Sequence, residues 1–129
     1  QCDYVVLSLE LNDQTFHIID AAQLAAMKKT AFLVNMGRGG LVNEPAMIEA
    51  LKNGGIAGAG LDTFETEPLP SESPLWNLPN VIITPHITPQ LPDKEERMLD
   101  YVYQNIKAYR ENGTFVNRVT LRNMLTPQK

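Results

Sequence analysis

Four short apolar runs alternate with helix-forming segments through the first part of the chain, and this alternation limits the possible folds more than any other feature. The runs cover residues 4–9, 31–35, 56–62 and 81–84. Short, nearly continuous apolar runs rich in β-branched residues are typical of strands buried on both faces of a parallel sheet. Single helices between such strands imply right-handed crossovers. The sequence therefore predicts an α/β fold whose parallel sheet is covered on both faces.

The helix between the first two runs and the one between the second and third are each marked by a capping residue. Asp20 is followed three positions later by Gln23, the spacing of a capping box, and this predicts a short helix. Asn43 with Pro45 in the first turn predicts a second helix, which ends before the glycines at 54 and 55. Each of these connections is therefore expected to hold one helix.

Two later segments depart from this alternation. Residues 65–80 contain Pro68, Pro70, Pro74 and Pro79, which predicts a loop without regular structure. From Pro92 to Gly113 the pattern predicts a long amphipathic helix, with apolar positions at Met98, Leu99, Val102, Ile106 and Tyr109. We expect residues 114–129 to be irregular or only briefly structured.

Composition excludes several classes of protein. The 129 residues can bury one core, and 11 basic against 15 acidic residues give a net charge of −4 without a basic patch for nucleic acid. No apolar run is long enough to predict a membrane span. The single cysteine, Cys2, excludes an internal disulfide and a cysteine-based zinc site, and no metal site is predicted. No secretory signal is evident, so a cytoplasmic location is expected.

Residues suited to chemistry follow the predicted strands. In a parallel sheet, ligands bind beyond the carboxyl ends of the strands, and Arg38, Asp62, Glu67 and His86 all fall at that edge. An arginine fork matches a carboxylate, a histidine exchanges a proton near neutral pH, and a neighbouring carboxylate favours the charged imidazole. Together these groups suit an oxidised or reduced α-substituted acid.

Each of these residues also has a purely structural interpretation. Arg38 could pair with a surface acid, and His86 could be a hydrogen-bonded histidine at a strand end. Glu67, with Glu65, could belong to a solvated acidic stretch. Asp62 could cap the turn that follows it. The residues alone leave these alternatives open.

Three stretches of the chain resemble the signature segments of the D-isomer-specific 2-hydroxyacid dehydrogenases. They are N-M-G-R-G-G-L-V-N-E at 35–44, G-L-D-T-F-E-T-E-P-L-P at 60–70 and P-N-V-I-I-T-P-H-I at 79–87, in the same order and with the same spacing. The resemblance extends over residues 2–87. The stretch F-V-N-R-V at 115–119 is similar to the glyoxylate and hydroxypyruvate reductase branch.

The resemblance implies a Rossmann-type half domain with a long C-terminal helix. Residues 1–91 would form the C-terminal half of an NAD(P)-binding domain, and residues 92–129 the helix and tail that return toward a substrate domain absent here. The chain opens at Gln1 and enters an apolar run by Tyr4, so we expect a piece of a longer protein. The intact protein is expected to be a homodimer.

The resemblance also assigns catalytic roles, and with them an activity. Arg38 would hold the substrate carboxylate and polarise the carbonyl group. His86 would donate a proton to the carbonyl oxygen as hydride arrives, and Glu67 would orient His86 and favour its charged form. The implied activity is hydride transfer between a nicotinamide cofactor and a small D-2-hydroxy acid or 2-oxo acid. Alternatives are a non-catalytic corepressor or sensor of the same fold, or an inactive fragment.

Cofactor contacts are implied at further positions. Asp62 would lie beside the nicotinamide carboxamide of NAD or NADP. The other expected contacts are Leu9, Met36, Gly37, Arg38 and the backbone near His86.

The chain departs from the family at a few positions. Ser8 and Glu10 stand where many members carry His and Pro, and Thr88-Pro89 replaces a small, glycine-containing pair. No G-x-G-x-x-G turn occurs, so the 129 residues hold only half of the expected cofactor site, and we predict weak or no turnover by the chain alone.

Overall fold

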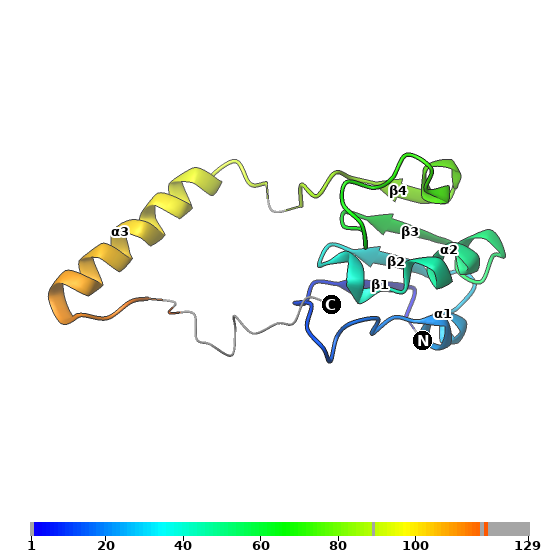
Figure 1. The fold of residues 1–129 in the computed structure, drawn as a ribbon, viewed down its shortest axis with the longest axis horizontal. Helices are drawn as coiled ribbons and strands as arrows, with labels where there is room; N and C mark the ends of the chain where they lie inside the picture. The colour runs from blue at the N-terminus through cyan, green and yellow to red at the C-terminus, as the bar shows by residue number, and fades with distance from the viewer. Residues whose placement is uncertain (1, 89, 117, 119–129) are drawn as a thin grey trace. The chain divides into compact units, whose positions relative to one another are not determined.

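The computed structural model describes residues 2–88, 90–116 and 118, which fall into two compact units. The first unit lies within residues 2–88 and is the predicted α/β half domain (Figure 1). Its elements in chain order are β1 (Tyr4–Leu7), α1 (Ala21–Ala26), β2 (Phe32–Asn35), η1 (Gly39–Leu41), α2 (Glu44–Lys52), β3 (Gly58–Leu61), η2 (Pro74–Asn77) and β4 (Val81–Ile83). The second unit contains α3 (Lys94–Asn112).

The four strands form one parallel sheet in the order β1-β2-β3-β4. Leu7 lies opposite Asn35, Asn35 opposite Leu61, and Leu61 opposite Ile83. The carboxyl ends of all four strands are therefore level, and the loops that follow them meet along one edge of the sheet. The predicted parallel α/β architecture is confirmed.

Both predicted helix caps are present. The Asp20 side chain and Gln23 form a capping box at α1, with Gln23 Oε1 accepting from Asp20 N at 3.1 Å. The Asn43 side chain accepts from Ala46 N at 3.1 Å and begins α2. These local bonds satisfy amide groups that the first turn of a helix leaves free.

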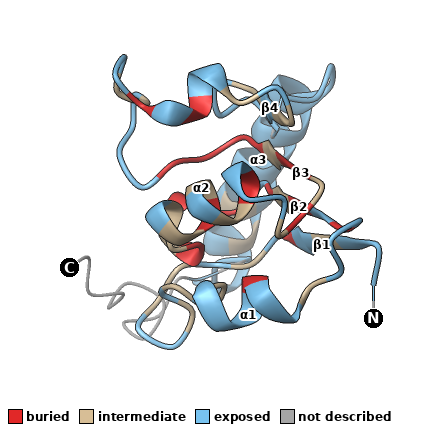
Figure 2. Cartoon of the chain, turned by 90° about the vertical axis from the view of Figure 1, so that its right-hand side faces the viewer, coloured by how far each residue is buried: buried red, intermediate tan, exposed pale blue. Residues whose placement is uncertain are grey.

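The two helices cover the same face of the sheet, so the prediction of two-sided burial is wrong. α1 and α2 contact each other and lie on the same side of the sheet (Figure 2). Their buried side chains belong to one cluster with Leu7, Leu33 and Leu61. The opposite face carries alternate residues that remain exposed: Tyr4, Val6, Phe32 and Ile82. Since the strands follow one another in order, successive right-handed crossovers place both helices on one side.

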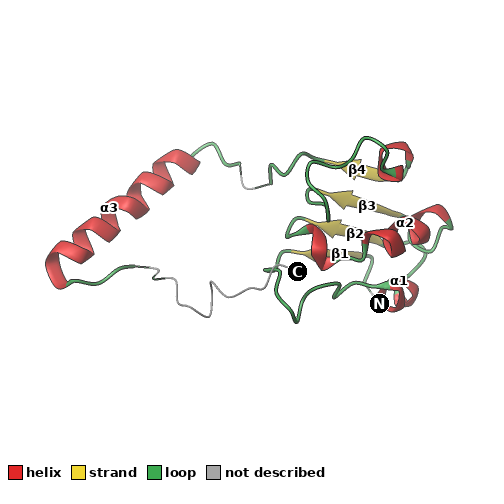
Figure 3. Cartoon of the chain, in the orientation of Figure 1, coloured by secondary structure: helices red, strands yellow, loops and turns green. Residues whose placement is uncertain are grey.

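The sequence predicts no regular structure in the proline-rich loop at residues 65–80, and this prediction is wrong for the last part of the loop. Its last part forms the 3₁₀ helix η2, drawn as a helix beside β4 in Figure 3. η2 starts at Pro74 and buries Leu75. The Ser73 hydroxyl accepts from Leu75 N at 3.4 Å. Proline fits the first position of such a turn because no intrahelical bond is lost there.

In the second unit, α3 has the amphipathic pattern and the glycine stop that the sequence predicts. Gly113 adopts a left-handed conformation with φ 68°, and its amide donates to Tyr109 O at 2.9 Å. No residue of α3 is buried. Within the described residues, no helix is both long and apolar enough to cross a membrane.

Candidate active site

The loops after β2 and β3 touch through their backbones at Gly39. A Cβ atom on Gly39 would lie 1.9 Å from the carbonyl carbon and oxygen of Phe64, a distance no side chain can occupy. Glycine is therefore required if these two loops are to meet. The contact brings the turn that carries Arg38 beside the loop that carries Glu67.

Asn35, at the end of β2, fixes the turn that carries Arg38. Its side chain is buried, accepts from Gly37 N at 3.1 Å through Oδ1 and donates to Arg38 O at 2.9 Å through Nδ2. Both bonds stay within three residues of Asn35, so they fix the turn locally. Asn35 was not among the predicted site residues, although an asparagine followed closely by glycine is a local turn signal.

Asp62, at the end of β3, holds the loop that carries His86. Its buried carboxylate accepts from Thr84 Oγ1 at 2.5 Å, from Ile87 N at 2.9 Å and from Thr88 N at 2.9 Å. Burial alone would raise the pKa of Asp62. Hydrogen bonds from Thr84, Thr88 and Ile87 outweigh that effect and hold its pKa well below the usual value. The ionised carboxylate of Asp62 thus holds the chain on both sides of His86, an arrangement that we call the Asp62 clamp.

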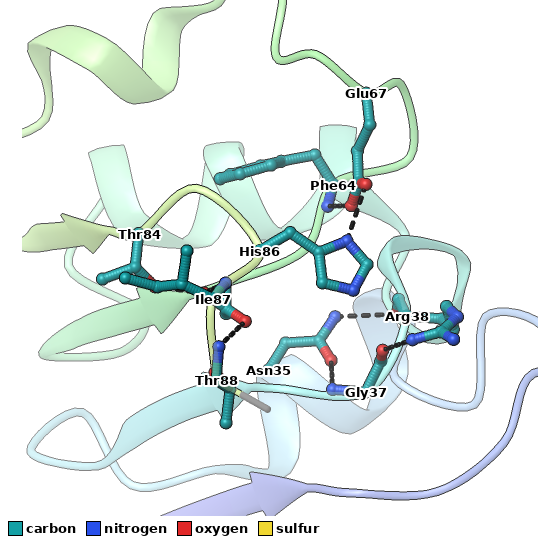
Figure 4. Close-up of polar contacts among 10 residues, drawn as sticks. Asn35, Gly37, Arg38, Phe64, Glu67, Thr84, His86, Ile87 and Thr88 are labelled. Atoms are coloured by element: carbon teal, nitrogen blue, oxygen red, sulfur yellow. Dashed lines mark hydrogen bonds and ion pairs between the residues drawn. The ribbon is translucent and has the colours of Figure 1, made fainter. Parts of the chain in front are cut away.

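His86 lies between Glu67 and the turn that carries Arg38 (Figure 4). Its Nδ1 is 2.9 Å from Glu67 Oε2, while Glu67 Oε1 accepts from Phe64 N at 3.0 Å. An ionised carboxylate only accepts hydrogen bonds, so Nδ1 carries the proton and Nε2 is left for another partner. His86 has φ 54°, a left-handed conformation uncommon for a residue with a side chain and frequent at functional sites.

Glu67 remains ionised in this setting. Burial acts to raise the pKa of Glu67, but the hydrogen bonds from His86 and Phe64 lower it, and the charge of Arg38 adds to that lowering. The net result is a pKa below the usual value.

Arg38 presents unused donors at the same edge. Its Nη1 donates to Gly37 O at 2.8 Å, and within the described part of the chain the guanidinium forms no ion pair. A guanidinium has five N–H donors, so most of them remain for a ligand. Arg38, Asp62, Glu67 and His86 therefore gather at one edge of the sheet, as their positions after the strands predicted.

The remaining residues expected near a cofactor lie along the neighbouring part of this edge. A Cβ atom on Gly37 would come within 3.0 Å of Leu9 O, so the loops after β1 and β2 also approach closely. Leu9 is half-buried, and Met36 and Ile87 are exposed. These apolar side chains all follow strands at this edge, and a flat heteroaromatic ring requires apolar surface of this kind.

A second histidine–glutamate pair, which the sequence did not predict, joins the loop after β1 to the same loop after β3. His17 Nε2 lies 2.8 Å from Glu65 Oε1, and Glu65 Oε1 also accepts from Glu44 N at 3.0 Å. In return, Glu65 N donates to Glu44 Oε2 at 3.2 Å. His17 and Glu65 are 48 positions apart, so only the strand order could have suggested that they meet.

Comparison with known proteins agrees with the fold. The family model described as "D-isomer specific 2-hydroxyacid dehydrogenase, NAD binding domain" matches residues 1–88. The chain is 48% identical over 108 residues to glyoxylate/hydroxypyruvate reductase B of Serratia proteamaculans, covering 84% of this chain and 33% of that protein. Over 125 residues it is 42% identical to the glyoxylate reductase of Pyrococcus horikoshii, covering 95% and 37%. The chain thus spans about a third of the length of these relatives.

Solved structures give the same result. A D-isomer specific 2-hydroxyacid dehydrogenase of Xanthobacter autotrophicus Py2 in complex with NADPH and MES superposes with a TM-score of 0.83 at 37% identity, covering 93% of this chain and 49% of that one. An NADPH-dependent glyoxylate/hydroxypyruvate reductase of Sinorhizobium meliloti in complex with citrate superposes with a TM-score of 0.79 at 36% identity, covering 92% and 38%.

Proposed function

Because this chain belongs to the D-isomer specific 2-hydroxyacid dehydrogenase family, we propose that it supplies the catalytic residues and half of the cofactor domain of an NAD(P)-dependent reductase of small 2-oxo acids, of the glyoxylate or hydroxypyruvate type. The observation that carries this proposal is the juxtaposition of the His86–Glu67 pair with the unused donors of Arg38. In the proposed arrangement, residues 1–91 form half of the cofactor domain and residues 92–129 reach toward a substrate domain.

Binding of the substrate would fall to Arg38. A 2-oxo acid presents a planar carboxylate next to a carbonyl oxygen, and a guanidinium binds such a carboxylate through two parallel hydrogen bonds. The short turn fixed by Asn35 holds the backbone of Arg38, so little conformational freedom of that turn is lost on binding. The carbonyl group is then held on the side of His86.

Proton transfer would fall to His86. In its protonated form, His86 donates the Nε2 proton to the carbonyl oxygen, which becomes the hydroxyl group of the product. Glu67 keeps the proton on Nδ1 throughout, so the ring ends neutral and recovers its second proton from solvent. A bound NADH or NADPH supplies the hydride that the carbonyl carbon receives.

The residues present fit the nicotinamide end of such a cofactor. Leu9, Met36 and Ile87 offer apolar surface next to the polar groups. The Asp62 clamp supports the nearby loop, and a contact of Asp62 with the carboxamide stays a prediction. The sequence holds no G-x-G-x-x-G turn for the pyrophosphate, so the rest of the cofactor site would come from outside these 129 residues. Homodimer formation and a cytoplasmic location also stay predictions.

A hybrid protein tests this function. In the hybrid reductase, this chain replaces the matching third of the Serratia proteamaculans relative. We expect it to oxidise NADH or NADPH in the presence of glyoxylate, hydroxypyruvate or pyruvate, with the unmodified relative as reference. The 129-residue chain alone should show weak or no turnover. A hybrid that folds and binds the cofactor but reduces none of the three acids would contradict the proposal.

A further inference from the structure

The loop between Phe64 and Glu67 places the carboxylate that holds His86. Among the residues that the structure describes, Glu67 bonds to His86 and to the backbone of Phe64, three residues earlier in its own loop, and to no other group. Its side chain is 38% exposed. The position of Glu67 therefore depends on how firmly the start of this loop is fixed.

Glu65 is the anchor of that loop. Its backbone amide and its carboxylate both bond to Glu44, at the first residue of α2, in a reciprocal pair. A carboxylate is stabilised at a helix N-terminus by the helix dipole and by the free amide groups there. The anchor ties the loop to a rigid element of the fold.

His17 completes this anchor from the other side. Its Nε2 donates to the Glu65 oxygen that also accepts from Glu44, and its backbone amide donates to Gly40 O at 2.8 Å. The ring of Phe16 stacks on that of His17 with centroids 3.9 Å apart. His17 therefore joins the loops after β1, β2 and β3 at one point.

We infer that His17 is a positioning residue for the His86–Glu67 pair, acting through Glu65 and the backbone of Phe64. The chain of contacts runs from His17 to Glu65, along one peptide to Phe64, and from the Phe64 amide to Glu67 and His86. The inference rests on the proposed function only for its catalytic meaning, since the positioning itself is a property of the fold.

Nitrogen-15 NMR of the 129-residue chain tests this inference directly, because the chain contains only two histidines. In the wild type, His86 should show a single neutral form with the proton on Nδ1. In His17→Asn that preference should be lost, and His86 should show a mixture of both neutral forms. Asparagine tolerates the left-handed backbone of His17, which has φ 50°, but its amide cannot reach the position of Nε2.

Two matched variants complete the test. His17→Gln places an amide donor near the Nε2 position and should restore the wild-type signals of His86. Lys28→Ala removes a pair of the same 2.8 Å length, Lys28–Asp3, at a distant place, and should change nothing at His86. An unchanged Nδ1–H form of His86 in folded His17→Asn would overturn the inference, whatever the activity of the hybrid reductase.

Amide hydrogen exchange of the wild-type chain decides the case if His17→Asn does not fold. The Glu65 and Phe64 amides bond to Glu44 and Glu67 respectively, and they should open together with exchange rates, corrected for sequence, within about threefold of each other. A Phe64 amide that exchanges roughly ten times more slowly than that of Glu65 would show that Glu67 is held without the anchor. That result would also overturn the inference.

Discussion

Two histidine–glutamate pairs bracket the same short loop, and they differ in which ring nitrogen meets the carboxylate. His17 uses Nε2 at 2.8 Å from Glu65, and His86 uses Nδ1 at 2.9 Å from Glu67. Both histidines have left-handed backbones, with φ 50° and 54°. Nε2 of His17 is thus occupied by a structural bond to Glu65, whereas Nε2 of His86 lies on the side of Arg38 (Figure 4). The proposed function thus gives two similar pairs different roles, with His17 as an anchor and His86 as the proton donor.

The largest difference between the pairs should appear in catalysis. In the hybrid reductase, His86→Ala should lower kcat by about 10²–10⁴-fold, since general acid catalysis contributes that much. His17→Asn should lower kcat at least about tenfold less, because misplacement of a catalytic group removes only part of its effect. Initial rates of cofactor oxidation at saturating substrate measure both. Equal losses of kcat in the two variants would contradict the division of roles.

A substitution that disturbs both histidine–glutamate pairs at once should have the next largest effect, on the free energy of unfolding. In Gly39→Ala the new methyl group would overlap the Phe64 backbone, and the loop that carries both glutamates must move away. We expect a loss of about 3 kcal/mol in the free energy of unfolding, at the upper end for overpacking. Urea denaturation of the 129-residue chain measures it.

Gly60→Ala is the control for this prediction. Gly60 lies in β3, and a Cβ atom on it would meet only Val34 side-chain atoms, at 3.8 Å and 3.9 Å. Its cost should stay within about 1 kcal/mol, the range for a substitution that needs no repacking. A similar cost for both glycines would refute the close approach at Gly39.

Asp62→Asn should separate the two pairs. An amide cannot accept all three hydrogen bonds that the carboxylate accepts from the loop around His86, so we expect a loss of about 1–3 kcal/mol in the free energy of unfolding. The Nδ1–H form of His86 should be disturbed while the His17–Glu65 bond persists. NMR signals of His17 that change as much as those of His86 would contradict this separation.

The smallest effect concerns pH. The pKa of Glu67 is lowered from its usual 4.5 in the folded chain, so its ionisation stabilises the fold above about pH 4.5. That stabilisation is lost as the pH falls through the lower folded value. Glu67→Gln should therefore lose less stability than the wild type between pH 4.5 and strong acid, as thermal unfolding across that range would show. Parallel curves for the two proteins would argue against the ionised pair.

The sequence was sufficient for the four strands, the three α-helices and the polar edge of the sheet, but not for the 3₁₀ helix η2. Asp20 and Asn43 mark helix starts through bonds to the next few residues, so local spacing predicts them. Arg38 and His86 follow strands directly, and a parallel sheet brings such positions together. Resemblance to a known family then supplied roles that spacing alone left open.

The rest depended on contacts that no local pattern records. The exposure of Tyr4 and Ile82 follows from both helices lying on one face, and strand order decides that. The bond between His17 and Glu65 joins residues 48 positions apart. The need for glycine at position 39 follows from a backbone contact with the loop after β3, which the sequence shows only as one glycine among several.

A crystal structure of the hybrid reductase with NADPH and oxamate, an unreactive analogue of a 2-oxo acid, would test the proposed chemistry most directly. We expect the oxamate carboxylate on the guanidinium of Arg38 and its carbonyl oxygen about 2.6–3.2 Å from His86 Nε2. His86 Nδ1 should remain on Glu67. Oxamate bound away from Arg38, or a His86 ring whose Nε2 faces Glu67 instead, would contradict the proposed proton transfer.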